Sequence, residues 1–126
     1  MIINLYLDSD ISNYANEYKI KSNKLLTELN RININMVEKY NYLIIPISIY
    51  NIIECSDHFK AYTQESKEDS LRRVGTIGGF ECYLDIYLPP NEILVSWDKA
   101  TSRNIKIESL LFDKKIEKQK KIKVMP

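Results

Sequence analysis

The sequence predicts an α+β fold: one long helix packed on a mainly antiparallel sheet, with a short second helix. Three observations support this fold class. Apolar residues recur at helical spacing in the first third of the chain, a short apolar run precedes a second helical pattern, and residues 80–97 alternate around glycine and proline turns. With 126 residues, the chain is expected to form a single domain over residues 1–126.

The composition indicates a globular protein and excludes several function classes. The chain is 44% hydrophobic and 28% charged, with 18 basic and 17 acidic side chains and a net charge of +1. No overall field draws it to nucleic acid or to an anionic membrane. The start of the chain lacks the pattern of a signal peptide, so we expect a cytoplasmic protein. Cys55 and Cys82 are expected to be reduced, buried small side chains.

The long helix is expected over residues 10–39, after a β-prone start at residues 2–7. Ser22 interrupts its apolar stripe, and the poor helix propensity of residues 30–35 predicts a bend or break there. The stripe consists of Ile11, Tyr14, Ala15, Tyr18, Leu25, Leu26, Leu29, Ile32, Met36, Val37 and Tyr40.

The next segment, YLIIP, predicts a buried strand that Pro46 ends. A short helix should follow, with Ser48 as its cap and Ile49, Ile52 and Ile53 facing inward. The polar residues 56–73 show no sustained period, so they are expected to form a long exposed loop.

Residues 74–97 predict a β-meander. Gly78 and Gly79 permit a tight turn before the strand that starts at Phe80, and the turn at Pro89 and Pro90 should let residues 92–97 pair back on it. The sequence KKIKV is expected to form a last strand or arm, with its lysines protecting an edge. The predicted core between helix and sheet is Leu43, Ile44, Ile45, Ile52, Leu84, Ile86, Ile93 and Val95.

Candidate chemical sites are each outweighed by a simpler interpretation. The glycines at 75–79 lack the lysine and the following helix of a phosphate-binding loop. His58, Cys55 and Cys82 do not have the paired spacing of a zinc site. We therefore expect no catalytic residue, no metal and no cofactor, and we do not expect an enzyme.

Charged side chains near the meander and at the C-terminal end are expected to be solvated. Glu81 and Asp85 should share one exposed strand face, with Glu92 and Asp98 nearby. The six lysines of DKKIEKQKKIKV could contact phosphates weakly, or they could border a solvated edge strand.

Across residues 10–97 the pattern resembles the axial domain of tailed-phage major capsid proteins. The resemblance rests on the order helix, YLIIPISIYNIIE, polar loop and VGTIGGFECYLDIYLPPNEILVSW. The matching positions are Gly75, Gly78, Gly79, Tyr83, Asp85, Pro89 and Pro90. Capsid subunits of this family are usually more than twice as long, so the chain would correspond to the axial domain with remnants of the peripheral domain.

The resemblance implies a structural, phage-like capsid subunit in the virion or the host cytoplasm that assembles with copies of itself or with other capsid subunits. Residues 57–73 would then form a mobile subunit-contact loop, in which mixed charges offer both signs to a neighbour. The residues expected in this contact are Asp57, Lys60, Glu65, Lys67, Glu68, Asp69, Arg72 and Arg73. The alternative is a small cytoplasmic module that binds nucleic acid or a protein through its basic C-terminal end, without membrane or small-molecule partners.

Overall fold

The computed structural model has an α+β fold with two helices and one mixed sheet. It describes residues 1–7, 14–34, 39–62, 67–68, 71–97 and 119–126. The helices are α1 (Tyr14–Asn33) and α2 (Ile47–Ile53). The strands are β1 (Ile2–Asn4), β2 (Tyr42–Ile45), β3 (Phe59–Ala61), β4 (Lys67–Glu68), β5 (Leu71–Ile77), β6 (Phe80–Asp85), β7 (Glu92–Ser96) and β8 (Gln119–Met125).

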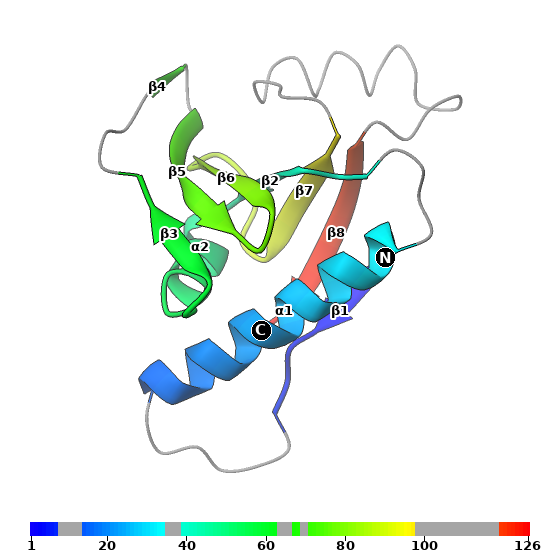
Figure 1. Cartoon of the computed structure of the whole chain (residues 1–126), viewed down its shortest axis with the longest axis vertical. Helices are drawn as coiled ribbons and strands as arrows, with labels where there is room; N and C mark the ends of the chain where they lie inside the picture. Colours follow the sequence, from blue (N-terminus) through cyan, green and yellow to red (C-terminus); the bar gives the residue numbers. More distant parts are fainter. Residues whose placement is uncertain (8–13, 35–38, 63–66, 69–70, 98–118) are drawn as a thin grey trace.

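The strand order is β1-β8-β7-β2-β6-β5-β3, and β4 also pairs with β5. Two pairs are parallel, β1 with β8 and β2 with β6, while the other pairs are antiparallel. Figure 1 shows β1 and β8 at one end of the sheet, β3 and β5 at the other, and α1 running along the molecule. Segments from both ends of the sequence therefore meet in one sheet.

Alternate side chains divide the sheet into two faces. The helix face packs against α1 and α2 and holds the main core, whereas the opposite face, called the open face below, holds a small cluster around Ile44 and Tyr83. Because β2 and β6 bury residues on both faces, neither strand shows one solvated side. The main core contains Ile3, Leu5, Leu25, Leu29, Tyr40, Leu43, Ile45, Ile49, Ile52, Ile53, Val74, Ile77, Phe80, Cys82, Leu84, Ile93, Val95, Ile122 and Val124.

Helix α1 ends within the predicted break. Its last residue, Asn33, accepts a hydrogen bond from the Tyr40 backbone N–H at 2.9 Å and donates one to the Tyr40 carbonyl at 2.9 Å. This side chain joins the end of the helix to the approach to β2. Ser22 is buried within the apolar stripe. Its hydroxyl can leave water without remaining unpaired, because it donates a 2.8 Å hydrogen bond to the Lys19 carbonyl. The predicted residues 10–13 and 35–38 lie outside the described residues.

Strand β2 and helix α2 form at the predicted positions, and Ile49, Ile52 and Ile53 are buried. The cap assignment was wrong, because Pro46 rather than Ser48 occupies the cap position. Proline suits the start of a helix, where a backbone N–H has no partner in the helix. The Ser48 hydroxyl instead accepts a 3.2 Å hydrogen bond from the Asn91 N–H, and so fixes the turn before β7.

The predicted β-meander was wrong in its order. Gly78 and Gly79, with φ values of 50° and 90°, do turn the chain between β5 and β6. Strand β7, however, pairs with β2 and β8 rather than with β6. Strand β2 lies between β6 and β7, since its apolar residues can be buried on both faces. Strand β8 likewise lies inside the sheet, so its lysines do not protect an edge.

The predicted loop at residues 56–73 was also wrong, because it contains β3, β4 and the start of β5. These strands lie at the sheet end farthest from β1, where polar side chains remain in water and leave no clear apolar alternation. Lys60 and Ala61 of β3 are both exposed. A strand of this kind is therefore hard to distinguish from a loop by pattern.

Six of the eight residues predicted between helix and sheet are buried there. Ile44 is buried on the open face instead, and Ile86 is 57% exposed. Strand β6 ends at Asp85, whose carboxylate accepts a 2.9 Å hydrogen bond from the Tyr87 N–H. This turn directs Ile86 away from the core. Asp85 itself is buried, so the expectation that Glu81 and Asp85 share a solvated face was wrong.

Candidate subunit interface

The structure distributes the predicted contact residues over one end of the sheet. Lys60 is exposed in β3, and Lys67 and Glu68 form β4 opposite Arg72 and Leu71. Asp57 precedes β3 and pairs with Lys19 of α1 at 2.7 Å, which ties the connection to the helix. Glu65 and Asp69 lie outside the described residues.

Arg73 belongs to a compact group on the open face. Its Nε lies 2.7 Å from Glu81 Oε1, and its guanidinium carbon lies 4.2 Å from the centre of the Tyr62 ring. The Tyr62 hydroxyl also approaches Glu81 Oε1 at 3.5 Å. The interaction with Tyr62 and the charge of Glu81 raise the pKa of Arg73, while desolvation opposes them. The ion pair links β5 to β6, and the Tyr62 ring brings the residue after β3 into the same group.

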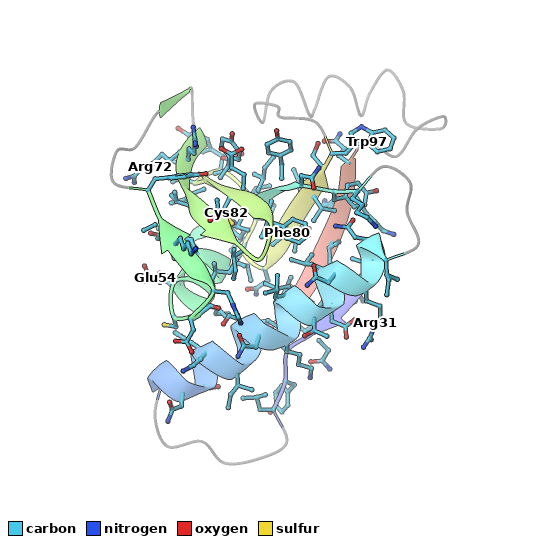
Figure 2. All side chains as sticks on the ribbon, viewed as in Figure 1. Arg31, Glu54, Arg72, Phe80, Cys82 and Trp97 are labelled. Carbon is cyan, nitrogen blue, oxygen red and sulfur yellow. The ribbon has the colours of Figure 1, made fainter. Side chains whose placement is uncertain are left out.

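Arg72 and Arg73 are half-buried rather than fully exposed, which corrects the prediction of a solvent-facing loop. Figure 2 shows Arg72 at the end of β5 nearest β4. Replacing both arginines with glutamate would put a like charge beside Glu81 and so disturb the fold as well as a contact. Lys60 is exposed, so replacing it tests a contact at this end of the sheet with less disturbance of the fold.

Tyr83 extends the same group toward the centre of the open face. It is 6% exposed, its ring centre lies 6.3 Å from that of Tyr42, and its hydroxyl has no hydrogen-bond partner among the described residues. Burial, followed by the nearby charge of Glu81, raises the pKa of Tyr83.

Sequence reasoning missed Tyr62 and Tyr83 as members of a polar group. The turn at Gly78 and Gly79 sets the register where β5 and β6 adjoin it, from Ile77 opposite Phe80 to Gly75 opposite Cys82. The bulge between Arg73 and Gly75 then shifts the register by one residue, and this shift places Arg73 opposite Tyr83. Pattern alone did not indicate it.

Gly75 determines how closely β3 can approach β5. A Cβ atom at this position would meet the Lys60 carbonyl and the Phe59 ring, the latter at 2.8 Å. Strand β3 therefore pairs here only because residue 75 is glycine. Pro89 and Pro90 are exposed in the turn between β6 and β7, which continues into Asn91 with a φ of 64°.

The other candidate groups do not come together as a metal site. Cys82 is buried in the core, where burial raises the pKa of its thiol to about 12. His58 is exposed and Cys55 is half-buried at the end of α2. Glu92 pairs with Lys121 at 3.3 Å across β7 and β8. Asp98 lies outside the described residues.

The other end of the sheet carries an exposed apolar group that the sequence analysis did not single out. Strand β1 ends the sheet in the described part of the chain, and several large apolar side chains around it face solvent. They are Met1, Ile2, Tyr6 and Met125, with Ile20 of α1 also exposed. Such grouping is typical of a protein contact surface.

No protein-family model matches this chain, and no curated protein matches it either. Among the helices that the structure describes, none combines the length and apolar character needed to cross a membrane.

Proposed function

We propose that the chain is a structural subunit of a phage-like capsid that assembles by symmetric association with copies of itself. One observation carries the proposal. The segment that resembles the axial domain belongs to a sheet that, in the described part of the chain, presents a strand edge at each end, at β1 and at β3. Another copy can continue such a sheet through backbone hydrogen bonds, which need no specific side chain.

The geometry of the resembling residues supports the same proposal. Gly75, Gly78 and Gly79 shape the β5–β6 hairpin and the close approach of β3, so their role in this chain is architectural. The mixed charges around β3, including Lys60 and Asp57, offer both signs to a neighbouring copy. A heterologous contact at this end would generate a ring when its rotation closes.

Sedimentation velocity and negative-stain electron microscopy across a concentration series test the proposal. We expect rings, shells or other defined oligomers that grow with protein concentration. Lys60→Glu should weaken this association, whereas Lys39→Glu, the same charge change at an exposed site outside the strands, should not. A monomer at every concentration would contradict the capsid function.

A second candidate is a module that binds nucleic acid through β8. Lys121 and Lys123 are both exposed and lie on the same face of this strand, which favours contact with phosphates. Retention on nucleic acid that falls steeply with salt, together with a monomeric chain, would support this candidate over the capsid. Charge reversal at Lys123 should then reduce the retention.

A further inference from the structure

We infer that the outer edge of β1 is a two-fold contact, in which β1 of one copy pairs antiparallel with β1 of a second copy. This inference deepens the proposed function, on which it rests, by naming the edge and the partner for one contact between subunits. Three features of the edge carry it: its free hydrogen-bonding groups, the closure of its end, and the apolar side chains beside it.

The hydrogen bonds between β1 and β8 show which backbone groups are free. The Met1 carbonyl accepts from Lys123 N–H at 3.1 Å, and Leu5 N–H donates to the Met125 carbonyl at 2.7 Å. Because successive residues of a strand direct their backbone groups to opposite sides, Ile2, Asn4 and Tyr6 direct theirs outward. Within the described residues, no strand pairs with this side of β1.

Two side chains close the outer edge at Tyr6. The Asn4 side-chain oxygen accepts a 2.9 Å hydrogen bond from the Tyr6 N–H, and Lys24 Nζ of α1 donates to the Tyr6 carbonyl at 3.2 Å. Among the residues that the structure describes, nothing pairs with the N–H and the carbonyl of Ile2 and of Asn4. This short edge is limited in length, which restricts unregulated strand addition.

The open edge is its own complement. In an antiparallel pair centred on Ile3, Ile2 lies opposite Asn4 of the second copy, and Asn4 lies opposite Ile2. Both are hydrogen-bonded pairs, since all four residues direct their groups toward the other strand. Every donor and acceptor left open on the two edges is then satisfied. A second copy therefore fits this edge without an unpaired backbone group, and it also brings the same exposed Ile2 and Tyr6 to the contact.

The side chains beside the edge fit the same arrangement. Ile2 and Tyr6 are 65% and 71% exposed and lie on the open face. In the proposed register Ile2 is diagonal to Ile2 and Tyr6 of the second copy, a spacing that long and aromatic side chains can bridge. Ile20, one helical turn before Lys24, is exposed on the side of α1 that reaches this edge. The contact would cover Ile2 and Tyr6 on the open face, while Ile20 borders the same edge from the helix face.

The contact is short, so the isolated dimer should be weak and dependent on concentration. Repetition in a closed assembly compensates for weak single contacts, because each further contact is formed within the same particle. A weak two-fold contact is therefore suited to a subunit that assembles in many copies.

Disulfide trapping tests the register directly. Chains carrying Ile2→Cys and Asn4→Cys are mixed under oxidising conditions. Residues in a hydrogen-bonded antiparallel pair have Cα atoms about 5.5 Å apart, which a disulfide can span. We expect the mixture to form several-fold more cross-linked dimer than either variant alone. If either variant alone formed as much cross-linked dimer as the mixture, the register would be wrong, and the inference with it.

A pair of proline variants tests the edge without cysteines. Ile2→Pro removes an outward N–H and leaves the bonds to β8 in place. Ala61→Pro removes the matching outward N–H of β3, since the neighbouring Tyr62 directs its N–H to Val74. The loss of two hydrogen bonds per dimer should weaken the β1 contact about 30-fold in Ile2→Pro and leave it unchanged in Ala61→Pro. If Ile2→Pro and Ala61→Pro weakened the dimer by the same factor, the inference would be contradicted.

The outcomes separate this inference from the proposed function. Larger assemblies that form without the β1 cross-link would refute the edge contact and retain the capsid function. A trapped β1 dimer that never grows into rings or shells would support the edge contact and refute the capsid function.

Discussion

The two faces of the sheet are equally well buried at their centre but differ in chemistry. Ile45 and Cys82 lie on the helix face in a continuous apolar core, while their chain neighbours Ile44 and Tyr83 lie on the open face in a small cluster. The open face also holds the ion pair of Arg73 with Glu81. One pair of strands therefore supports both a dry core and a polar group.

The difference teaches that burial alone does not distinguish a stabilising face from an interacting one. Ile44 and Ile45 have nearly the same low exposure, 1% and 0%. What differs is whether the polar atoms nearby have hydrogen-bond partners. The buried Tyr83 hydroxyl on the open face has none among the described residues. We expect the helix face to determine folding and the open face to tolerate change.

The largest effect should come from placing a charge on the helix face. Ile45→Asp should destabilise the domain by about 3–5 kcal/mol or prevent folding, because it buries an unpaired carboxylate. Ile86→Asp is the matched control, since Ile86 is exposed and its replacement should change the free energy of unfolding by no more than about 0.5 kcal/mol. Urea denaturation followed by circular dichroism measures both. A normal melting curve for Ile45→Asp would show that β2 is not central.

The free energy of unfolding should fall at alkaline pH, because Cys82 is buried away from water. Its thiol has a pKa raised from 9.0 to about 12 by burial, so the unfolded chain loses this proton at lower pH than the folded protein. The contribution to stability is fully present below pH 9 and declines as the pH rises toward 12. The slope should be about 1.4 kcal/mol per pH unit for this group.

Urea denaturation at several pH values between 8 and 11 measures this slope. Cys82→Val keeps an apolar side chain of similar size but has no thiol to titrate. Above pH 9 its free energy of unfolding should therefore fall less steeply than that of the parent protein, by about 1.4 kcal/mol per pH unit. Identical slopes in both proteins would mean that the thiol is accessible to solvent, and the contrast between the faces would be weaker than described.

The smallest effect should come from the open face. Tyr83→Phe removes a buried hydroxyl that has no partner in the described structure, so it should raise the free energy of unfolding by about 1 kcal/mol or leave it unchanged. Tyr87→Phe, at an exposed site, is the control. A loss of stability in Tyr83→Phe alone would show that the hydroxyl is already bonded within the folded chain.

Local patterns predicted the parts of the fold that depend on neighbouring residues. The end of α1, the inward residues of α2 and the turn at Gly78 and Gly79 are all visible in short stretches of sequence. The α+β class follows from the same stretches. Each depends on spacing or on backbone freedom, which a few residues determine.

The errors arose where distant segments decide the outcome. Strand β2 pairs with β6 and β7, two segments that follow it by about forty and fifty residues, and alternation cannot specify such partners. Tyr83 and Asp85 are buried because both faces of β6 are covered, which a single strand pattern does not reveal. The polar group of Arg73, Glu81 and Tyr62 depends on the same pairings, so the candidate site was predicted only as a charged segment.

The parallel pairing of β1 with β8 has a mechanical consequence. Met1 lies beside Lys123 and Leu5 beside Met125, so a force applied at the two chain ends pulls the strands past each other along their length. The hydrogen bonds between them then share the load and must break together, whereas an unzipping pull would break them one at a time. The pairing of β1 with β8 should therefore resist a stretching force applied through these two strands.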